Sequence, residues 1–250
     1  EPYYNLQLQG GNRNFLSPSI DLSGPVTENG RLLYRLNALY RQEDSFRDYD
    51  SSFNRFFVGP TLTWLISAQT DLTVNLEYIK DDDPYVTGTA AFGEGLADIP
   101  LERVLNNPND TIRQEYLNVG YNLEHRFSDN WRLRNQFRYY SSDYEYSVFP
   151  LLLSLDESTG IFNRLFGSQA SETDTYALHT NVQGEFNTGS VEHTLLFGVD
   201  LARAEDMNVS RASFNNPALL TPINIFNPDY SAVPTPNLED IPVLFGNDAT

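Results

Sequence analysis

Apolar and polar residues alternate with a period of two along this chain, over stretches of ten residues or more. In the clearest stretch, Leu32, Leu36 and Tyr40 alternate with Arg31 and Arg35. Three further stretches repeat the pattern: 71–80, 115–127 and 191–201. Successive side chains of a strand point to opposite faces of a sheet, so each segment is amphipathic only as a strand.

Weaker alternation adds five segments, at 3–9, 17–26, 53–66, 131–144 and 173–186, which makes about nine predicted strands and no helix among them. The connections between the strands alternate in length. Short polar turns are expected at 28–30, 67–71, 128–130 and 188–190. Long connections are expected at 43–52, 81–111, 146–171 and from 206 onward, with 244–250 loop-like in composition. Short turns on one rim and long loops on the other are typical of bacterial outer-membrane barrels.

A soluble antiparallel sandwich also alternates apolar and polar residues. Its strands usually run for about 5–6 residues, whereas a tilted strand that crosses about 30 Å of hydrocarbon needs about ten. Aromatic residues recur near the predicted strand ends, among them Tyr40, Trp64, Tyr78 and Trp131, as membrane–water boundaries favour. The predicted fold class is therefore all-β, as a segment of a transmembrane antiparallel β-barrel.

Composition excludes several classes of function. The 34 acidic and 16 basic residues leave a net charge of −18, which is unsuited to nucleic acid because phosphate binding needs a basic surface. The chain has no cysteine, so disulfides and thiolate metal sites are absent. No apolar run approaches the roughly 18–20 residues of a spanning helix. A mean hydropathy of −0.42 is compatible with a barrel, since only alternate residues face lipid.

No catalytic constellation is visible, and an enzyme is not predicted. His125, His179 and His193 are far apart in sequence, and neither an HExxH motif nor a phosphate-binding glycine loop is present. The acidic run 81–83 offers oxygen ligands to a hard cation, but its spacing matches no calcium motif, so a solvated loop is the better interpretation. No catalytic residue and no metal ligand is predicted.

Several short motifs carry a family resemblance. They are FVGPTLTW at 57–64 with TDLT at 70–73, LEHRFSDNWRLRN at 123–135, GSVEHTLLFGVD at 189–200 and INIFNP at 223–228. In this order they resemble the barrel of TonB-dependent siderophore receptors, most of all the branch that imports ferric hydroxamates. The likeness extends from about residue 16 to 228.

The resemblance implies a 22-stranded barrel with a plugged lumen. Nine strands cannot close that circumference, and an open sheet edge is not viable in lipid. Residues 1–250 are therefore expected to form part of one barrel domain, with the plug and the remaining strands outside this sequence. The implied function is import of ferric siderophores energised through TonB. The implied partners are the ferric siderophore, outer-membrane lipid and the TonB complex, reached through the plug region. Iron would travel inside the chelate, so no cofactor is implied.

Four aromatic residues are candidates for siderophore binding. Alignment with the family's ligand-contacting loops points to Phe92 and Phe149, and Tyr85 and Tyr146 are two further candidates. Ring surfaces and a few polar groups hold bulky organic ligands. For each residue alone, packing within a loop is the competing interpretation.

Charged residues on the polar side of the strands are expected to face the lumen and its plug. They are Arg31, Arg35, Glu77, Glu124, Arg126, Arg134 and Arg138. An arginine turned toward the bilayer midplane instead would cost about 2–4 kcal/mol. Two other functions remain open: a diffusion porin or small structural barrel, without a plug or saturable binding, and a soluble β-rich binding protein, which would not need detergent.

Overall fold

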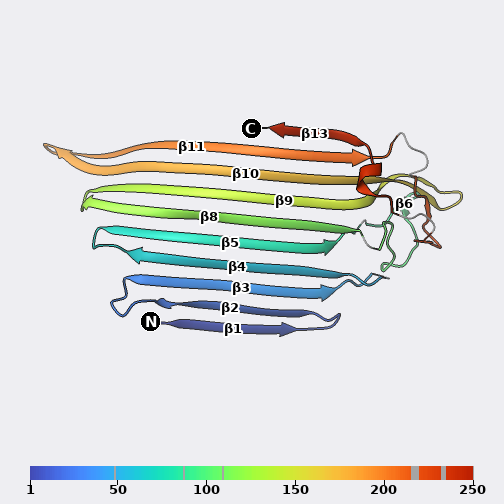
Figure 1. Ribbon diagram of the computed structural model, residues 1–250, viewed down its shortest axis with the longest axis horizontal. Coiled ribbons are helices and arrows are strands. Elements are labelled where there is room, and N and C mark those ends of the chain that lie inside the picture. The colour runs from blue at the N-terminus through green and yellow to red at the C-terminus, as the bar shows by residue number, and fades with distance from the viewer. Residues whose placement is uncertain (48, 87, 109, 215–219, 232–234, 250) are drawn as a thin grey trace.

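The computed structural model of the chain describes residues 1–47, 49–86, 88–108, 110–214, 220–231 and 235–249. Its main element is one antiparallel sheet in which each long strand pairs with the next along the chain (Figure 1). The strands, in order across the sheet, are β1 (Tyr3–Gly10), β2 (Leu16–Pro25), β3 (Leu32–Asp44), β4 (Ser52–Leu65), β5 (Thr70–Pro84), β8 (Thr111–Ser128), β9 (Trp131–Asp156), β10 (Ile161–Thr188), β11 (Val191–Ala212) and β13 (Val243–Ala249).

The nine predicted strands are all present, and β13 adds a tenth to the row. The prediction of a loop at 244–250 is wrong for residues 244–249, which the structure describes. Phe245 pairs with Ser210 of β11, and Gly246 pairs with Val209. The segment is too short and too rich in Gly, Asn and Asp to signal a strand on its own. Hydrogen bonds from the neighbouring strand decide its conformation.

The long loop expected at 146–171 is also absent. Instead, β9 and β10 continue as a hairpin that projects beyond the other strands, and its turn contains Gly160 at φ +72°. Pro150 lies within this extension and pairs with Phe166 inside the ladder. Irregularities in register beside Arg164 and after Gly167 accommodate the proline and glycine without ending either strand.

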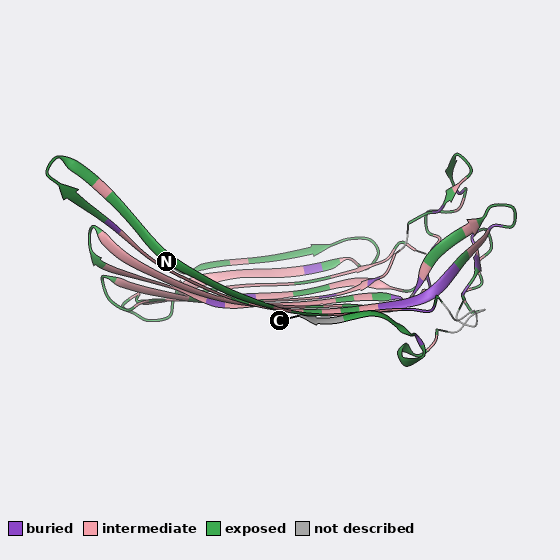
Figure 2. Cartoon of the chain, turned by 90° about the horizontal axis from the view of Figure 1, so that it is seen from above, coloured by how far each residue is buried: buried purple, intermediate pink, exposed green. Residues whose placement is uncertain are grey.

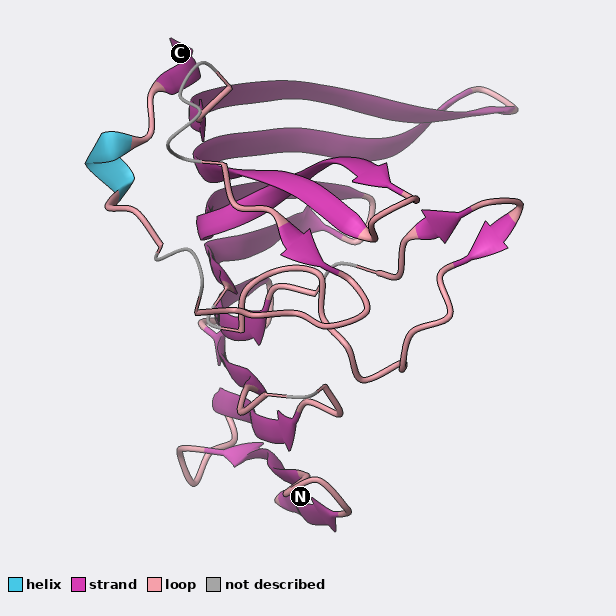
Figure 3. Ribbon diagram, turned by 90° about the vertical axis from the view of Figure 1, so that its right-hand side faces the viewer, coloured by secondary structure: helices cyan, strands magenta, loops and turns pink. Residues whose placement is uncertain are grey.

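The asymmetry of the connections is confirmed. Short turns at one end join β2 to β3, β4 to β5, β8 to β9 and β10 to β11, and segments 45–51, 85–110 and 213–242 lie at the other. Figure 3 views the molecule from this loop end, where the hairpin of β6 (Ala91–Phe92) and β7 (Gly95–Leu96) stands clear of the sheet. The loops also contain β12 (Ile223–Asn224), which pairs with β10, and a 3-10 helix, η2 (Leu238–Asp240). No helix in the described ranges is long and apolar enough to cross a membrane.

Cross-strand register separates the sheet into two chemically different faces. On one, Leu76 lies opposite Val119, Val119 opposite Tyr139, and Tyr139 opposite Tyr176. We call this the apolar face. Directly opposed residues share a face, so pairing transmits the alternation from strand to strand.

The other side of the sheet is the polar face. Arg35 lies opposite Thr61, Thr61 opposite Asn75, and Gly120 opposite Arg138. The sheet is a single curved layer, and neither face is covered (Figure 2). Every buried hydrophobic residue among those described lies at the loop end: Ala90, Ala97, Val104, Leu105, Leu165, Phe166, Ala212, Ile223, Ile225 and Ile241. We call this group, with the segments that carry it, the loop cluster.

Candidate ligand-binding site

Tyrosines gather where the polar face meets the loop cluster. Tyr140, Tyr144 and Tyr146 lie at alternate or doubly alternate positions of β9, so they share a face. Tyr116 of β8 lies opposite Ser142, between the pairs formed by Tyr140 and Tyr144, and Tyr85 directly follows the end of β5. We call these five residues the tyrosine cluster.

Ring contacts connect the tyrosine cluster in two groups. Tyr146 makes edge-on contacts with Tyr85, at 5.4 Å between centroids, and with Tyr144, at 4.8 Å. Tyr116 stacks on Tyr140 at 6.4 Å. The groups meet through Gln114, which accepts a 3.1 Å hydrogen bond from the Tyr116 hydroxyl and lies directly opposite Tyr144. The result is an aromatic surface made of two ring-contacting groups, Tyr85–Tyr146–Tyr144 and Tyr116–Tyr140.

Burial raises the pKa of Tyr85 above its ordinary value, and the neighbouring Tyr146 contributes. Burial also raises the pKa of Tyr144, together with its hydrogen bond to Tyr146. Both phenols therefore stay neutral at physiological pH. A neutral phenol donates one hydrogen bond and accepts others, which suits the oxygen atoms of an organic chelate.

A small hollow lies on the polar face over β3, β4 and β5, and none of the five tyrosines is among its lining residues. It measures about 200 Å³ and is lined by Arg41, Phe53, Asn54, Arg55, Asp81 and Asp83. Arg55 forms a two-point ion pair with the buried Asp81, with both distances 2.7 Å. The strand register relates this ion pair to the tyrosine cluster: Asp81 lies opposite Gln114, and Gln114 lies opposite Tyr144. Typical ligand pockets hold about 300–1,000 Å³, so the hollow has room for only part of a ligand.

The structure brings together two of the four predicted siderophore contacts, Tyr85 and Tyr146. Phe92 instead contacts Phe226 edge-on at 5.6 Å and packs against the buried core of the loop cluster. Phe149 lies in β9 opposite Gly167, and its side chain is outside the described part of the structure. Thus two candidates line the aromatic surface and one packs among loops.

Sequence reasoning missed Tyr116, Tyr140 and Tyr144. The even spacing of Tyr140, Tyr144 and Tyr146 was a usable signal for a shared face. Tyr139 and Tyr140 are adjacent, and alternation with the predicted inward Arg138 already places Tyr140 on the polar face, in agreement with the register. Tyr116 carries no local signal, because its partner Tyr140 lies on another strand.

The register places the strand residues among the predicted inward charges on the polar face. Arg35 pairs with Asp21 at 2.9 Å. Glu124 accepts from Arg126 at 2.6 Å and from Arg134 at 2.9 Å. Glu77 accepts a 3.1 Å hydrogen bond from Asn118.

The remaining two predicted inward charges are Arg138 and Arg31. Arg138 lies opposite Gly120 on the neighbouring strand. A Cβ atom added to Gly120 would come within 2.8 Å of the Arg138 Cδ atom. The small residue thus leaves room for the arginine side chain. Arg31 is exposed and precedes the first residue of β3, so its assignment to the polar face rests on alternation with Arg35.

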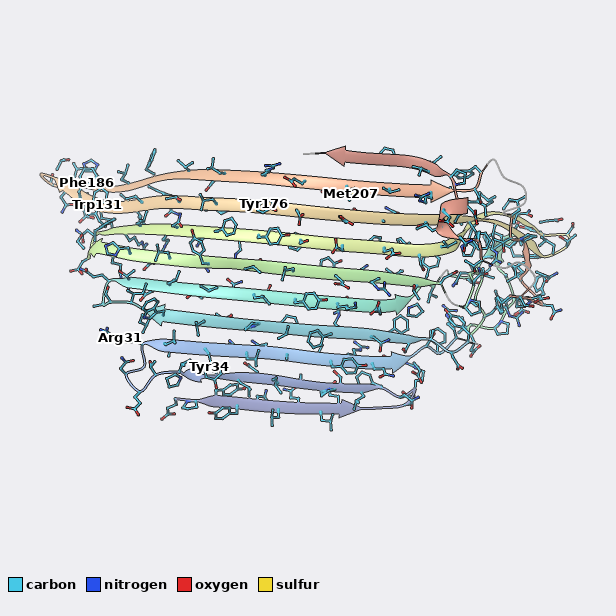
Figure 4. All side chains as sticks on the ribbon, in the orientation of Figure 1. Arg31, Tyr34, Trp131, Tyr176, Phe186 and Met207 are labelled. Carbon is cyan, nitrogen blue, oxygen red and sulfur yellow. The ribbon has the colours of Figure 1, made fainter. Side chains whose placement is uncertain are left out.

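The apolar face is bounded by aromatic residues at both ends. Toward the loops, Phe56 contacts Tyr78 at 6.2 Å between ring centroids, and Tyr139 contacts Tyr176 at 5.0 Å. At the turn end, Trp131 stacks on Phe186 at 6.4 Å (Figure 4). Beyond the loop-side aromatics the same face becomes charged, with ion pairs Lys80–Glu115 at 2.7 Å and Arg113–Asp82 at 2.8 Å. An apolar band between aromatic girdles is the outer surface of a transmembrane barrel.

The three histidines remain separate in space. His179 contacts Asp200 at 2.8 Å, His125 contacts Thr70 at 2.8 Å, and His193 contacts Thr188. Over the described ranges, no group of three or more acidic or histidine side chains is arranged to hold a metal ion. The site therefore consists of aromatic and hydrogen-bonding groups.

Residues 60–248 match the family described as TonB dependent receptor-like, beta-barrel. The chain belongs to this family. Its members are outer-membrane transporters rather than enzymes. The apolar face and its aromatic girdles are therefore the membrane-facing wall of an outer-membrane barrel.

Among curated relatives, the metal-pseudopaline receptor CntO of Pseudomonas aeruginosa is 27% identical over 205 residues, which cover 81% of this chain and 28% of that protein. The ferrioxamine B receptor of Salmonella typhimurium is 26% identical over 236 residues, covering 92% of this chain and 32% of that protein. This chain thus spans about a third of the length of these relatives.

The fold matches solved receptors. The ferripyoverdine receptor of the outer membrane of Pseudomonas aeruginosa, solved bound to ferripyoverdine, superposes with a TM-score of 0.80. The superposition covers 99% of this chain and 33% of that chain at 19% identity. At that identity the comparison establishes the shared barrel fold.

Proposed function

We propose that the complete protein is a TonB-energised receptor that imports a ferric siderophore or a related metal chelate, and that this chain forms part of its wall and outer mouth. The observation that carries the proposal is the tyrosine cluster, an aromatic surface placed where the polar face meets the loops. The names of the relatives, receptors for ferrioxamine B and for metal-pseudopaline, support an organic metal chelate as the cargo.

In this proposal Tyr85 and Tyr146 contact the chelate directly. Their rings offer flat apolar area to its organic backbone, and their neutral hydroxyls offer hydrogen bonds to its oxygen atoms. The hollow beside Arg55 accepts one polar arm. Phe92 and Phe149 remain candidate contacts, with Phe92 acting from the packed side of the loop cluster.

The polar face would line the lumen and contact the plug. The exposed side chain of Arg35, at 59%, keeps donors available beyond its pair with Asp21. Arg138, which lies over Gly120, is the second candidate for a plug contact. Replacing both by leucine in the complete receptor should loosen the plug and admit antibiotics that the outer membrane normally excludes. Unchanged antibiotic exclusion would argue against these two contacts.

The test of the binding site uses the complete receptor with Tyr85→Ala and Tyr146→Ala, singly and together. Aromatic contacts are worth about 0.5–1.5 kcal/mol each beyond their buried area, so the double variant should bind its chelate at least roughly tenfold more weakly. The probes are ferrioxamine B, metal-loaded pseudopaline and ferripyoverdine, with TonB-dependent uptake of radioactive iron measured in parallel.

The matched control is Tyr176→Phe, a tyrosine change on the apolar face that should leave the affinity unchanged. Wild-type affinity in the double variant would refute the assigned site. Non-saturable, TonB-independent passage of small solutes would instead support a diffusion porin and overturn the transport proposal.

A further inference from the structure

Arg164 is a buried arginine in the projecting part of β10, within the loop cluster. Arg164 is 2% exposed, and its guanidinium is surrounded by oxygen atoms of other segments. Nε donates to the Thr221 carbonyl at 2.7 Å, Nη1 to the Leu105 carbonyl at 2.6 Å and Nη2 to the Thr221 hydroxyl at 3.1 Å. The Asn107 side-chain oxygen lies 3.4 Å from Nη2.

These contacts join three segments that are far apart in sequence: β10, the segment 104–110 and the segment 220–226. The backbone reinforces the junction, since the Thr221 N–H donates to the Arg164 carbonyl at 2.9 Å. Arg103 donates to the carbonyls of Ile225 and Phe226 at 3.0 and 2.7 Å. The loops are thereby held to the hairpin as one body.

The same body holds the backbone of Tyr85 on both sides. The Tyr85 N–H donates to the Asp110 carbonyl at 2.8 Å, and the Asn106 side chain donates to the Tyr85 carbonyl at 2.7 Å. The Asn107 N–H in turn donates to the Asp110 carboxylate at 2.7 Å. The residues Leu105, Asn106 and Asp110 therefore connect Arg164 with the backbone of Tyr85.

The positions of the acceptors around Arg164 require a planar guanidinium group. A guanidinium presents several donors in fixed directions, whereas a lysine ammonium is a compact charge that cannot reach the Leu105 and Thr221 carbonyls in the same geometry. Burial lowers the pKa of Arg164 to about 10, which still leaves the side chain charged at neutral pH. Removing the side chain would leave buried carbonyls without donors.

We propose that Arg164 is a positioning residue of the ligand site, which fastens the segments 104–110 and 220–226 to β10 and so sets the place of Tyr85 beside Tyr146. The inference rests on the proposed function for its effect on binding. Its structural part, the control of Tyr85, stands independently of which chelate is bound.

The experiment compares Arg164→Met and Arg164→Lys in the complete receptor, with Arg132→Met as the matched control. Arg132 is an arginine of β9 at the turn end of the sheet, far from the loops, where it donates to the Gln183 side chain. Hydrogen exchange of the Tyr85, Leu105 and Thr221 amides should be at least tenfold faster in both Arg164 variants and unchanged in Arg132→Met. Amides of β3 to β5 serve as an internal control for an intact barrel. Unchanged exchange at Tyr85 in both Arg164 variants would overturn the proposal.

A double-mutant cycle separates positioning from general damage. Arg164→Met should weaken binding of whichever probe chelate binds the wild type by roughly tenfold, but by less than twofold in a Tyr85→Ala background, because the effect runs through Tyr85. Equal losses in both backgrounds would contradict the proposed role. If Tyr85→Ala alone leaves binding unchanged while exchange at Tyr85 still accelerates in the Arg164 variants, the proposed binding site fails and the positioning role stands.

Discussion

The transmembrane sheet and the loop cluster are built on opposite plans. In the sheet, large apolar side chains such as Val74 and Leu195 are exposed, at 44% and 45%, and none of the described segments forms a second layer over them. In the loop cluster, Leu105, Phe166 and Ile225 are at most 1% exposed. A soluble protein would show the reverse, with its strands buried and its loops exposed.

The difference shows which surroundings complete each region. The apolar face of the sheet is completed by membrane lipid, so its residues need no partner within the chain. The loop cluster faces water and must bury its own apolar groups and satisfy its own polar ones. This explains why the buried Arg164 is surrounded by carbonyls of the same chain, whereas ion pairs of the sheet such as Arg35–Asp21 remain partly exposed.

The largest effect is expected from a cavity in the loop cluster. Leu105→Ala should lower the free energy of local opening of the loops by about 2–5 kcal/mol, as for other fully buried leucines. Hydrogen exchange in detergent or lipid should report this in segments 85–110 and 220–226, with β3 to β5 unaffected. Val74→Ala on the apolar face is the comparison, and it should change exchange little because lipid can fill the space. An equal effect of the two changes would break the contrast between the regions.

A charge on the membrane-facing wall should have the next largest effect. Leu76→Arg places an arginine in the apolar band, next to the loop-side Tyr78, and should reduce the stability of the folded barrel by up to about 2–4 kcal/mol, which is the cost at the bilayer midplane. Thr73→Arg, on the same strand but on the polar face, is the matched control and should cost far less. Reversible unfolding of the complete receptor in lipid vesicles measures both. A costly Thr73→Arg with a harmless Leu76→Arg would mean that the faces are assigned the wrong way round.

The loop cluster alone should respond to pH near neutrality. Burial raises the pKa of Asp110 from 3.8 to about 7, and hydrogen bonds from Asn107 and Asn106 and the charge of Arg164 only partly offset this. The folded loops therefore bind a proton that the unfolded segment releases, so their stability falls as pH rises from about 4 to 7 and then levels off.

Between pH 5 and pH 8 the loss should be roughly 2 kcal/mol for a shift of this size. Hydrogen exchange of the Tyr85 amide, corrected for the intrinsic pH dependence, measures it. Asp110→Asn should remove the pH dependence of the Tyr85 amide. A pH dependence that persists in Asp110→Asn would assign the titration to another group.

Sequence alone predicted nine strands, the separation of their faces and the alternation of short turns with long loops. It did so because an alternation with a period of two is amphipathic only in a strand. A strand that crosses a membrane must also keep this alternation over more residues than soluble strands usually contain. Alternation also placed Arg35 and Glu124 on the polar side of their strands, whereas the siderophore contacts of Tyr85 and Tyr146 stay a prediction.

Only the tertiary structure decided the rest. β13 and the projecting parts of β9 and β10 exist because neighbouring strands supply their hydrogen bonds, which no local composition reveals. The tyrosine cluster depends on register between strands, since Tyr116 and its partner Tyr140 lie on neighbouring strands. Arg164 looks ordinary in the sequence, and its partners lie 57 to 59 residues away. Period-two alternation determines which way a side chain points, but contacts between distant segments determine what it meets.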